Sequence, residues 1–96
     1  MSDIGVIATL RVQPGKEAEF EAVFAELAPA VRANEPGNSY YRLFRTSETG
    51  VYKVMECYAG AAALEAHRAS DHFRTLGANL APCLAGAPEI ERLIAV

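Results

Sequence analysis

The chain has 96 residues, 51% of them hydrophobic, and a formal net charge of −3, and this length predicts a single domain over residues 1–96. The nine basic residues are scattered and no apolar run approaches the ~20 residues of a membrane-spanning helix, so neither nucleic acid nor a membrane is expected as a partner. The first residues lack the pattern of a signal peptide, so we expect a cytoplasmic protein in which Cys57 and Cys83 stay free thiols.

Residues 4–12 predict the first strand, because apolar side chains alternate along IGVIATLRV before the turn signal Pro14-Gly15. From Lys16 to Asn34 the apolar residues recur at the spacing of an amphipathic helix. That helix should bury one stripe of side chains: Phe20, Val23, Phe24, Leu27 and Val31. Pro29 lies inside the pattern and is expected to bend the helix.

Two extended runs follow at residues 40–46 and 51–58, and the four residues between them are typical of a hairpin turn. Side chains on a strand alternate between its two faces. The second run therefore places four residues on one face: Tyr52, Val54, Glu56 and Tyr58.

Residues 60–69 predict a short Ala-rich helix, and Ser70 is suited to be the N-cap of a further helix. That further helix is expected to turn four side chains inward, with Pro82 disturbing its last turn: Phe73, Leu76, Leu80 and Leu84. Residues 90–96 alternate again and predict a fourth strand.

This order of elements is that of a ferredoxin-like α+β fold, β-α-β-β-α-β, with the second helix broken in two. We expect a four-stranded antiparallel sheet with helices on one face. The other face has no cover within the chain, and the hydrophobic content is high for so small a domain. A homodimer that buries this face is therefore expected.

The two histidines are candidate functional residues. His67 follows Leu64 by three residues and should face the sheet, either as a core histidine satisfied by one hydrogen bond or as a catalytic group. His72 lies in the first turn of a helix, where the helix dipole favours a neutral imidazole. It is therefore either an exposed polar residue or a base that accepts a proton near pH 7.

Glu56 is the third candidate, because a carboxylate on a half-buried strand face costs energy unless a partner binds it. The candidate partners are His67, His72, Arg42 and Arg45. Such a pair would be either a structural clamp between helix and sheet or an acid–base pair in a pocket. The histidines lack the spacing of a metal site, so no metal is expected.

Three segments resemble the antibiotic biosynthesis monooxygenase family: VQPGKEAEFE, EPGNSYYRLFR, and ECY…ALEAH…SDHF between Glu56 and Phe73. The likeness runs over nearly the whole chain and is greatest for small quinol-monooxygenase-type members. It implies a dimeric α+β barrel, in which two sheets pack face to face and each subunit has a pocket between sheet and helices. In the best-known members a deprotonated phenol or quinol reacts with molecular oxygen, without metal or flavin.

The resemblance therefore implies a monooxygenase without cofactors that acts on a small aromatic or quinol substrate. His72 is the first candidate for the base, with His67 or Glu56 orienting or replacing it. Aromatic side chains would supply flat walls for the substrate ring. These are Tyr41 or its neighbour Tyr40, Tyr52, Tyr58 and Phe73.

Two other functions stay open. One branch of the family isomerises a phosphorylated diketone derived from autoinducer-2, and its motifs occur here as EPGN at residues 35–38, Glu56-Cys57-Tyr58 and His67…His72-Phe73. The other is a non-catalytic module that binds a small ligand. A pocket lined by Tyr and Phe with room for a bicyclic ring would favour the monooxygenase. Arg or Lys converging there would favour a phosphorylated substrate, and a filled pocket would favour the module.

Overall fold

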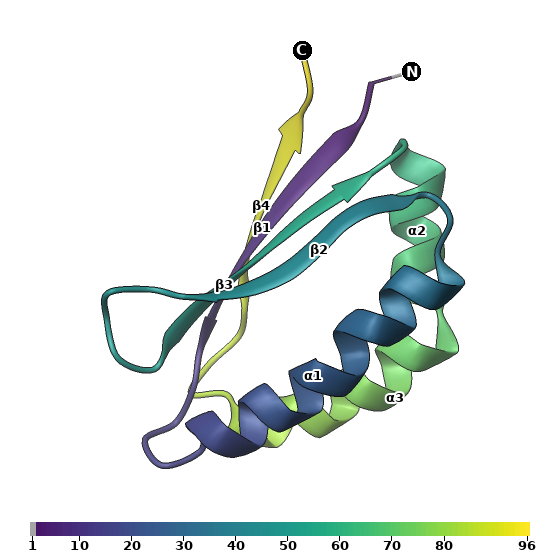
Figure 1. The fold of residues 1–96 in the computed structure, drawn as a ribbon. Coiled ribbons are helices and arrows are strands. Elements are labelled where there is room, and N and C mark those ends of the chain that lie inside the picture. Colours follow the sequence, from purple (N-terminus) through teal and green to yellow (C-terminus); the bar gives the residue numbers. More distant parts are fainter. Residues whose placement is uncertain (1) are drawn as a thin grey trace.

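The computed structural model describes residues 2–96, in which a four-stranded antiparallel sheet carries three helices on one face (Figure 1). The elements are β1 (Ile4–Arg11), α1 (Glu17–Asn34), β2 (Asn38–Arg45), β3 (Val51–Tyr58), α2 (Ala61–Ala69), α3 (Asp71–Leu80) and β4 (Glu89–Ile94). The strand order across the sheet is β2-β3-β1-β4. Within residues 2–96, no helix combines the length and apolar character needed to cross a membrane. The predicted ferredoxin-like α+β fold is confirmed.

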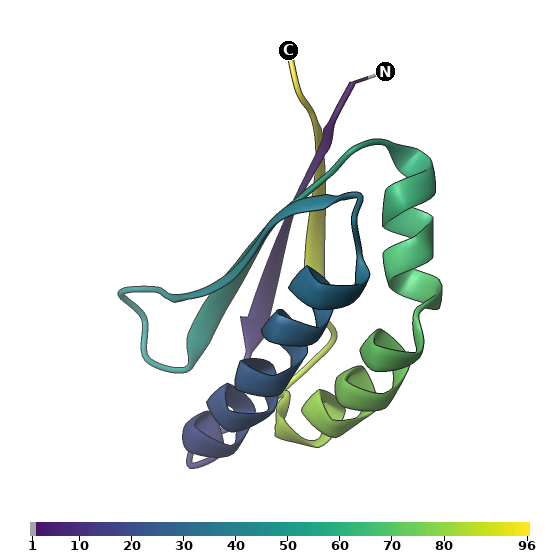
Figure 2. The same ribbon diagram turned by 45° about the vertical axis from the view of Figure 1, so that its right-hand side comes forward.

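One face of the sheet packs against the helices, and the alternation along β1 defines it. Ile4, Val6, Ala8 and Leu10 are buried, whereas the residues between them are only half-buried. The predicted stripe of α1 packs against this face, with Phe20, Phe24, Leu27 and Val31 buried. α3 lies beside α1, and α2 continues past the end of α1 (Figure 2).

The end of α3 differs from the prediction. The helix stops at Leu80, and residues 81–83 form one turn of 3-10 helix, because Pro82 has no backbone N–H to continue the α-helical pattern. Leu84 was expected on the inner face of this helix, and it lies beyond the helix end, although its side chain still packs against the core. It lies in an isolated bridge with Val12 instead. The predictions for Ser70 and for free cysteines are confirmed, since the Ser70 hydroxyl accepts from the Phe73 N–H at 3.3 Å and both cysteines are free thiols.

The turn after α1 passes very close to α2. A side-chain carbon added at Gly37 would lie 2.6 Å from Cβ of Ala63, a separation that real side chains do not tolerate. The backbone oxygen of Gly37 also accepts from the N–H of Ala59 at 2.8 Å. A glycine at this position therefore lets the carboxyl end of α1 approach the start of α2.

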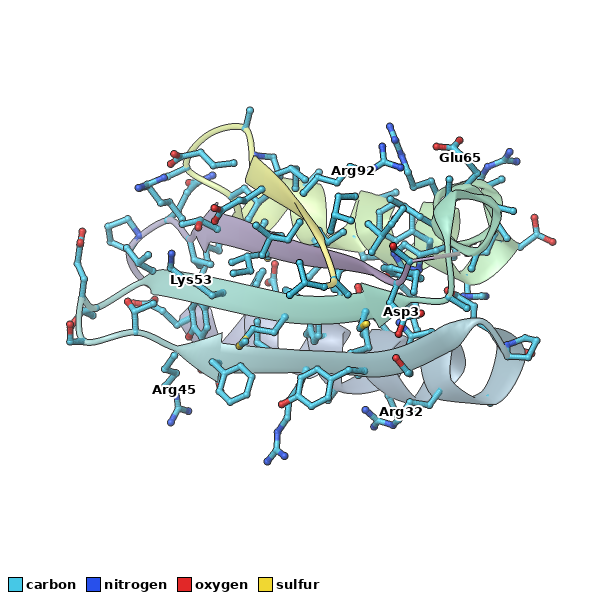
Figure 3. All side chains as sticks on the ribbon, turned by 90° about the horizontal axis from the view of Figure 1, so that it is seen from above. Asp3, Arg32, Arg45, Lys53, Glu65 and Arg92 are labelled. Atoms are coloured by element: carbon cyan, nitrogen blue, oxygen red, sulfur yellow. The ribbon has the colours of Figure 1, made fainter. Side chains whose placement is uncertain are left out.

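The opposite face of the sheet is uncovered by helices within residues 2–96, and Figure 3 looks onto it. Register with β1 and β3 assigns four large apolar residues to this face, because their partners point away from the helices. All four are more than a third exposed: Tyr40, Phe44, Met55 and Leu93.

Candidate functional site

Glu35 joins both histidines at the carboxyl end of α1. Its backbone N–H still donates to the carbonyl of Val31 at 3.0 Å, so the residue continues the last turn of the helix. Its buried carboxylate accepts a hydrogen bond from Nδ1 of His67 at 2.9 Å and another from Nε2 of His72 at 2.5 Å. A single carboxylate therefore ties the end of α1 to both α2 and α3.

This contact fixes the tautomer of His67, whose side chain is 4% exposed. A carboxylate can only accept hydrogen bonds, so Nδ1 of His67 carries the hydrogen and Nε2 of the neutral ring is an acceptor. Nε2 lies 4.0 Å from Oε1 of Glu56. Burial lowers the pKa of His67, although the hydrogen bond to Glu35 opposes this effect. The ring is therefore neutral near pH 7, with Nε2 free to take a proton.

Glu56 projects from β3 toward the helices, and its side chain is 9% exposed. The hydroxyl of Tyr58 donates a hydrogen bond to Oε1 at 2.6 Å. Burial raises the pKa of the Glu56 carboxyl to about 7, the Tyr58 hydrogen bond opposes this shift, and the charge of Glu35 adds to it. Glu56 can therefore exchange a proton near neutral pH.

The partners expected for Glu56 are only partly found. Nε2 of His67 lies at ion-pair distance but beyond hydrogen-bond distance. The other three candidates contact different groups: His72 binds Glu35, Arg45 binds Glu21, and the Arg42 guanidinium lies 5.7 Å from the centre of the Phe44 ring. The hydrogen bond to Glu56 comes instead from its neighbour on the same strand face, Tyr58.

A cavity of about 550 Å³ lies between the sheet and the helices, within the ~300–1,000 Å³ range of small-molecule sites. Apolar side chains make most of its wall, including Val6, Leu10, Phe24, Leu27, Val54 and Leu64. The side formed by β4 is open to solvent, since Ile90 lines the cavity and is 63% exposed.

The residues predicted from sequence divide into two groups around this cavity. Four line it: His67, Glu56, Tyr41 and Phe73. Three do not: His72 contacts Glu35, Tyr58 is fully buried beside Glu56, and Tyr52 donates to Glu21 at 2.5 Å near the other end of β3. Of the predicted residues, the cavity wall thus holds one histidine, one carboxyl and two aromatic rings, and their roles stay predictions.

Aromatic rings surround the imidazole of His67. The ring centre of Phe73 lies 4.5 Å from that of His67, and the ring centre of Tyr41 lies 5.4 Å away. Burial raises the pKa of Tyr41, and the charges of Glu56 and Glu35 raise it further. The Tyr41 hydroxyl therefore stays protonated and can donate a hydrogen bond to an oxygen in the cavity.

Glu35, His67 and His72 are also the residues best placed to hold a metal ion, because ligand atoms from all three lie within 4.8 Å of one another. A cation bound at about 2.0–2.2 Å from each ligand separates neighbouring ligand atoms by roughly 3 Å or more. The His72 Nε2 to Glu35 Oε2 distance is 2.5 Å. Without an ion, the three side chains form a hydrogen-bonded clamp.

Sequence reasoning noted Glu35 only as part of the EPGN motif and did not predict its contact with the histidines, although one further signal was present. A glutamate directly before Pro36-Gly37 lies at the carboxyl end of a helix, where the helix dipole disfavours negative charge. Such a residue needs compensating donors. The two histidines supply them across 32 and 37 residues of sequence.

A model of the family described as antibiotic biosynthesis monooxygenase matches residues 3–78. The chain belongs to this family, and the resemblance found in its motifs is confirmed. No protein with curated function matches the sequence significantly.

Solved structures agree with this assignment. A candidate antibiotic biosynthesis monooxygenase from Caulobacter crescentus is 55% identical, with a TM-score of 0.96 over 99% of this chain and 91% of that one. A conserved protein from Methanosarcina mazei is 26% identical, with a TM-score of 0.91 over 97% and 92% of the two chains. A further candidate monooxygenase, from Bordetella bronchiseptica, is 26% identical, with a TM-score of 0.85 over 100% and 99%. The family and these neighbours support a general monooxygenase-type role.

Proposed function

We propose that this protein is a cofactor-independent monooxygenase that oxidises a small aromatic or quinol substrate with molecular oxygen. One observation carries the proposal. The Glu35–His67 hydrogen bond leaves Nε2 of His67 unprotonated and directed toward Glu56 in the wall of a mostly apolar cavity. Membership of the monooxygenase family supports the same reaction class.

His67 acts as the base in this proposal. Nε2 removes the proton of a phenolic hydroxyl, and the Glu35 carboxylate stabilises the imidazolium that forms. Tyr41 donates a hydrogen bond to the resulting phenolate oxygen, and Glu56 exchanges protons at the same end of the cavity. The apolar wall keeps the anion poorly hydrated, which makes it a better electron donor.

The electrons for oxygen come from the substrate. The phenolate transfers an electron to oxygen, the two radicals combine to form a carbon–oxygen bond, and the oxygen–oxygen bond then breaks. One oxygen atom stays on the ring and the other leaves as water with two hydrogens of the substrate. One quinol and one oxygen molecule thus give one hydroxyquinone and one water.

Oxygen uptake tests this function directly. After exhaustive metal chelation, the protein should consume oxygen with dihydroxynaphthalene-type quinols faster than buffer does, and label from isotopic oxygen should appear in the ring. Catalase is the control, because spontaneous oxidation makes hydrogen peroxide and catalase returns half of that oxygen. A rate no better than buffer across the quinol panel would overturn the proposal and leave the isomerase or the binding module.

We further propose that the protein is a homodimer in which two sheets pack face to face. Exposed Tyr40, Phe44, Met55 and Leu93 on the helix-free face support this arrangement, and a two-fold axis makes such a face self-complementary. Light scattering at micromolar concentration should give twice the monomer mass of 10.3 kDa. Met55→Lys should give a folded monomer, because it buries a charge in the interface. A monomer mass for the unmodified protein would contradict the proposal.

An isomerase that takes a phosphorylated substrate is the second candidate, favoured by Arg68 and Arg92 in the cavity wall. It requires no oxygen. Conversion of a phosphorylated diketone under argon, followed by NMR, would support this candidate, and the same protein would then give no quinol-dependent oxygen uptake.

A further inference from the structure

The open end of the cavity carries two arginines that the proposed reaction does not use. Arg92 lies on β4 and Arg68 on α2, directly after His67. In Figure 3, Arg92 of β4 and Glu65 of α2 lie along the same edge of the molecule. Both arginines line the cavity between the sheet and the helices, on the side of it that is open to solvent at β4.

Strand register relates Arg92 to the candidate acid–base residues. Val6 of β1 is opposite Glu56 on one side and opposite Arg92 on the other. All three side chains point toward the helices, because directly opposed residues share a face. At ~4.8 Å between strands, the Cα atoms of Glu56 and Arg92 are roughly 10 Å apart. The cavity thus has an acid–base end and a cationic end.

The charge of the cavity wall is positive although the whole chain has a net charge of −3. Glu56 is the carboxyl in the wall, and it is largely protonated below about pH 7. Two acids of β4, Glu89 and Glu91, are opposite Thr9 and Ile7 and so belong to the other face. Arg68 pairs with Glu65 at 3.5 Å, but both are well exposed, and such a pair is weak enough to exchange for a ligand.

We infer that the substrate is a hydroxylated aromatic compound that also bears an ionised acid group, and specifically a carboxylate. The ring lies in the apolar part of the cavity beside Phe73, and the hydroxyl is at His67 and Glu56. The carboxylate binds at Arg92, where the planar guanidinium can donate two parallel hydrogen bonds, and Arg68 contributes from the α2 side of the same cavity. This inference rests on the proposed function for the hydroxyl end, but the acid-binding end is testable without any reaction.

Equilibrium binding under argon separates the two questions. The probes are 6-hydroxy-2-naphthoate, which has hydroxyl and carboxylate at opposite ends of the ring, and 2-naphthol, which lacks only the carboxylate. We expect the naphthoate to bind about 10-fold tighter or more, a preference that falls with added salt. Arg92→Gln should abolish most of this preference and Arg68→Gln should reduce it. Arg74→Gln, an equal change of charge on the exposed face of α3, should leave it unchanged.

Each outcome bears on the inference. Equal affinity for the two probes, or a preference that survives both cavity variants, would overturn it. Naphthyl phosphate binding tighter than the naphthoate would replace the carboxylate by a phosphate, and glycerol phosphate binding as well as either would remove the aromatic ring from the inference. If the naphthoate binds tightly but the protein shows no oxygen uptake with the quinol panel, the proposed monooxygenase is rejected and the acid-binding site is kept.

Discussion

Replacing His67 with alanine should lower the rate of quinol-dependent oxygen uptake by about 10²–10⁴-fold, the usual contribution of a general base. The expectation follows from geometry, because Nε2 of His67 is the imidazole nitrogen that faces Glu56 at the cavity wall. The rate is measured with an oxygen electrode under saturating dihydroxynaphthalene. Circular dichroism and thermal unfolding of the variant show whether it has kept its fold, and His67→Gln keeps more of the buried volume.

His72→Ala and Glu56→Gln are the companion variants. His72 does not line the cavity, so its loss should reduce the rate less than the loss of His67. A reduction for His72→Ala as large as that for His67→Ala would restore His72 as the base. Unchanged rates in all three folded variants would reject a general base in this cluster.

The Glu35→Gln variant distinguishes a role of Glu35 in positioning His67 from a purely structural role. It is measured in the same oxygen-uptake assay. Glutamine can still accept from Nδ1 of His67, so the tautomer is retained, but the negative charge is lost. Because the negative charge of Glu35 raises the pKa of His67, its loss should move the acidic limb of the pH–rate profile to lower pH while the rate falls. A purely structural role for Glu35 would lower the rate without moving that limb.

We expect the effect of Glu56→Gln on the free energy of unfolding to depend on pH. The substitution should be more stabilising above neutral pH than in acid, by about 3 kcal/mol. Burial raises the pKa of Glu56 from 4.5 to about 7 in the folded chain. Below about pH 4.5 the carboxyl is protonated whether folded or unfolded, and its contribution to stability is fully present. As pH rises through about 7 the fold must hold a buried carboxylate, and that contribution is lost. The difference corresponds to about 1.4 kcal/mol for each pH unit between the two pKa values.

Urea unfolding at about pH 5 and about pH 8, at one fixed protein concentration, measures this effect. The variant keeps the oxygen that accepts from the Tyr58 hydroxyl, so its packing changes little. Glu26→Gln, an exposed position on α1, is the matched control and should show no such dependence on pH. If the free energies of Glu56→Gln and the unmodified protein stay parallel between the two pH values, Glu56 does not carry a raised pKa.

The elements follow from local properties of the chain, and so the sequence predicts them. The strand predicted over residues 4–12 and the helix predicted from Lys16 to Asn34 correspond to β1 and α1 within one residue at each end. Ser70 begins α3 as expected, because an N-cap depends only on its own helix turn. Leu84 packs against the core as predicted but lies outside the helix, because Pro82 ended the helix sooner than periodicity alone suggested.

The candidate site was only partly predictable for a physical reason. The spacing of Leu64 and His67 determines that His67 faces inward, and strand parity determines the same for Glu56, because both depend on the backbone repeat of a single element. Sequence by itself determined those directions and the family. Which groups then meet depends on how separate elements pack. The close approach of Gly37 to Ala63 brings Glu35 to both histidines, and pairing of β4 with β1 brings Arg92 into line with Glu56. Only the tertiary structure decided that His67 lines the cavity and that His72 does not, since contacts across 32 or more residues leave no local period in the chain.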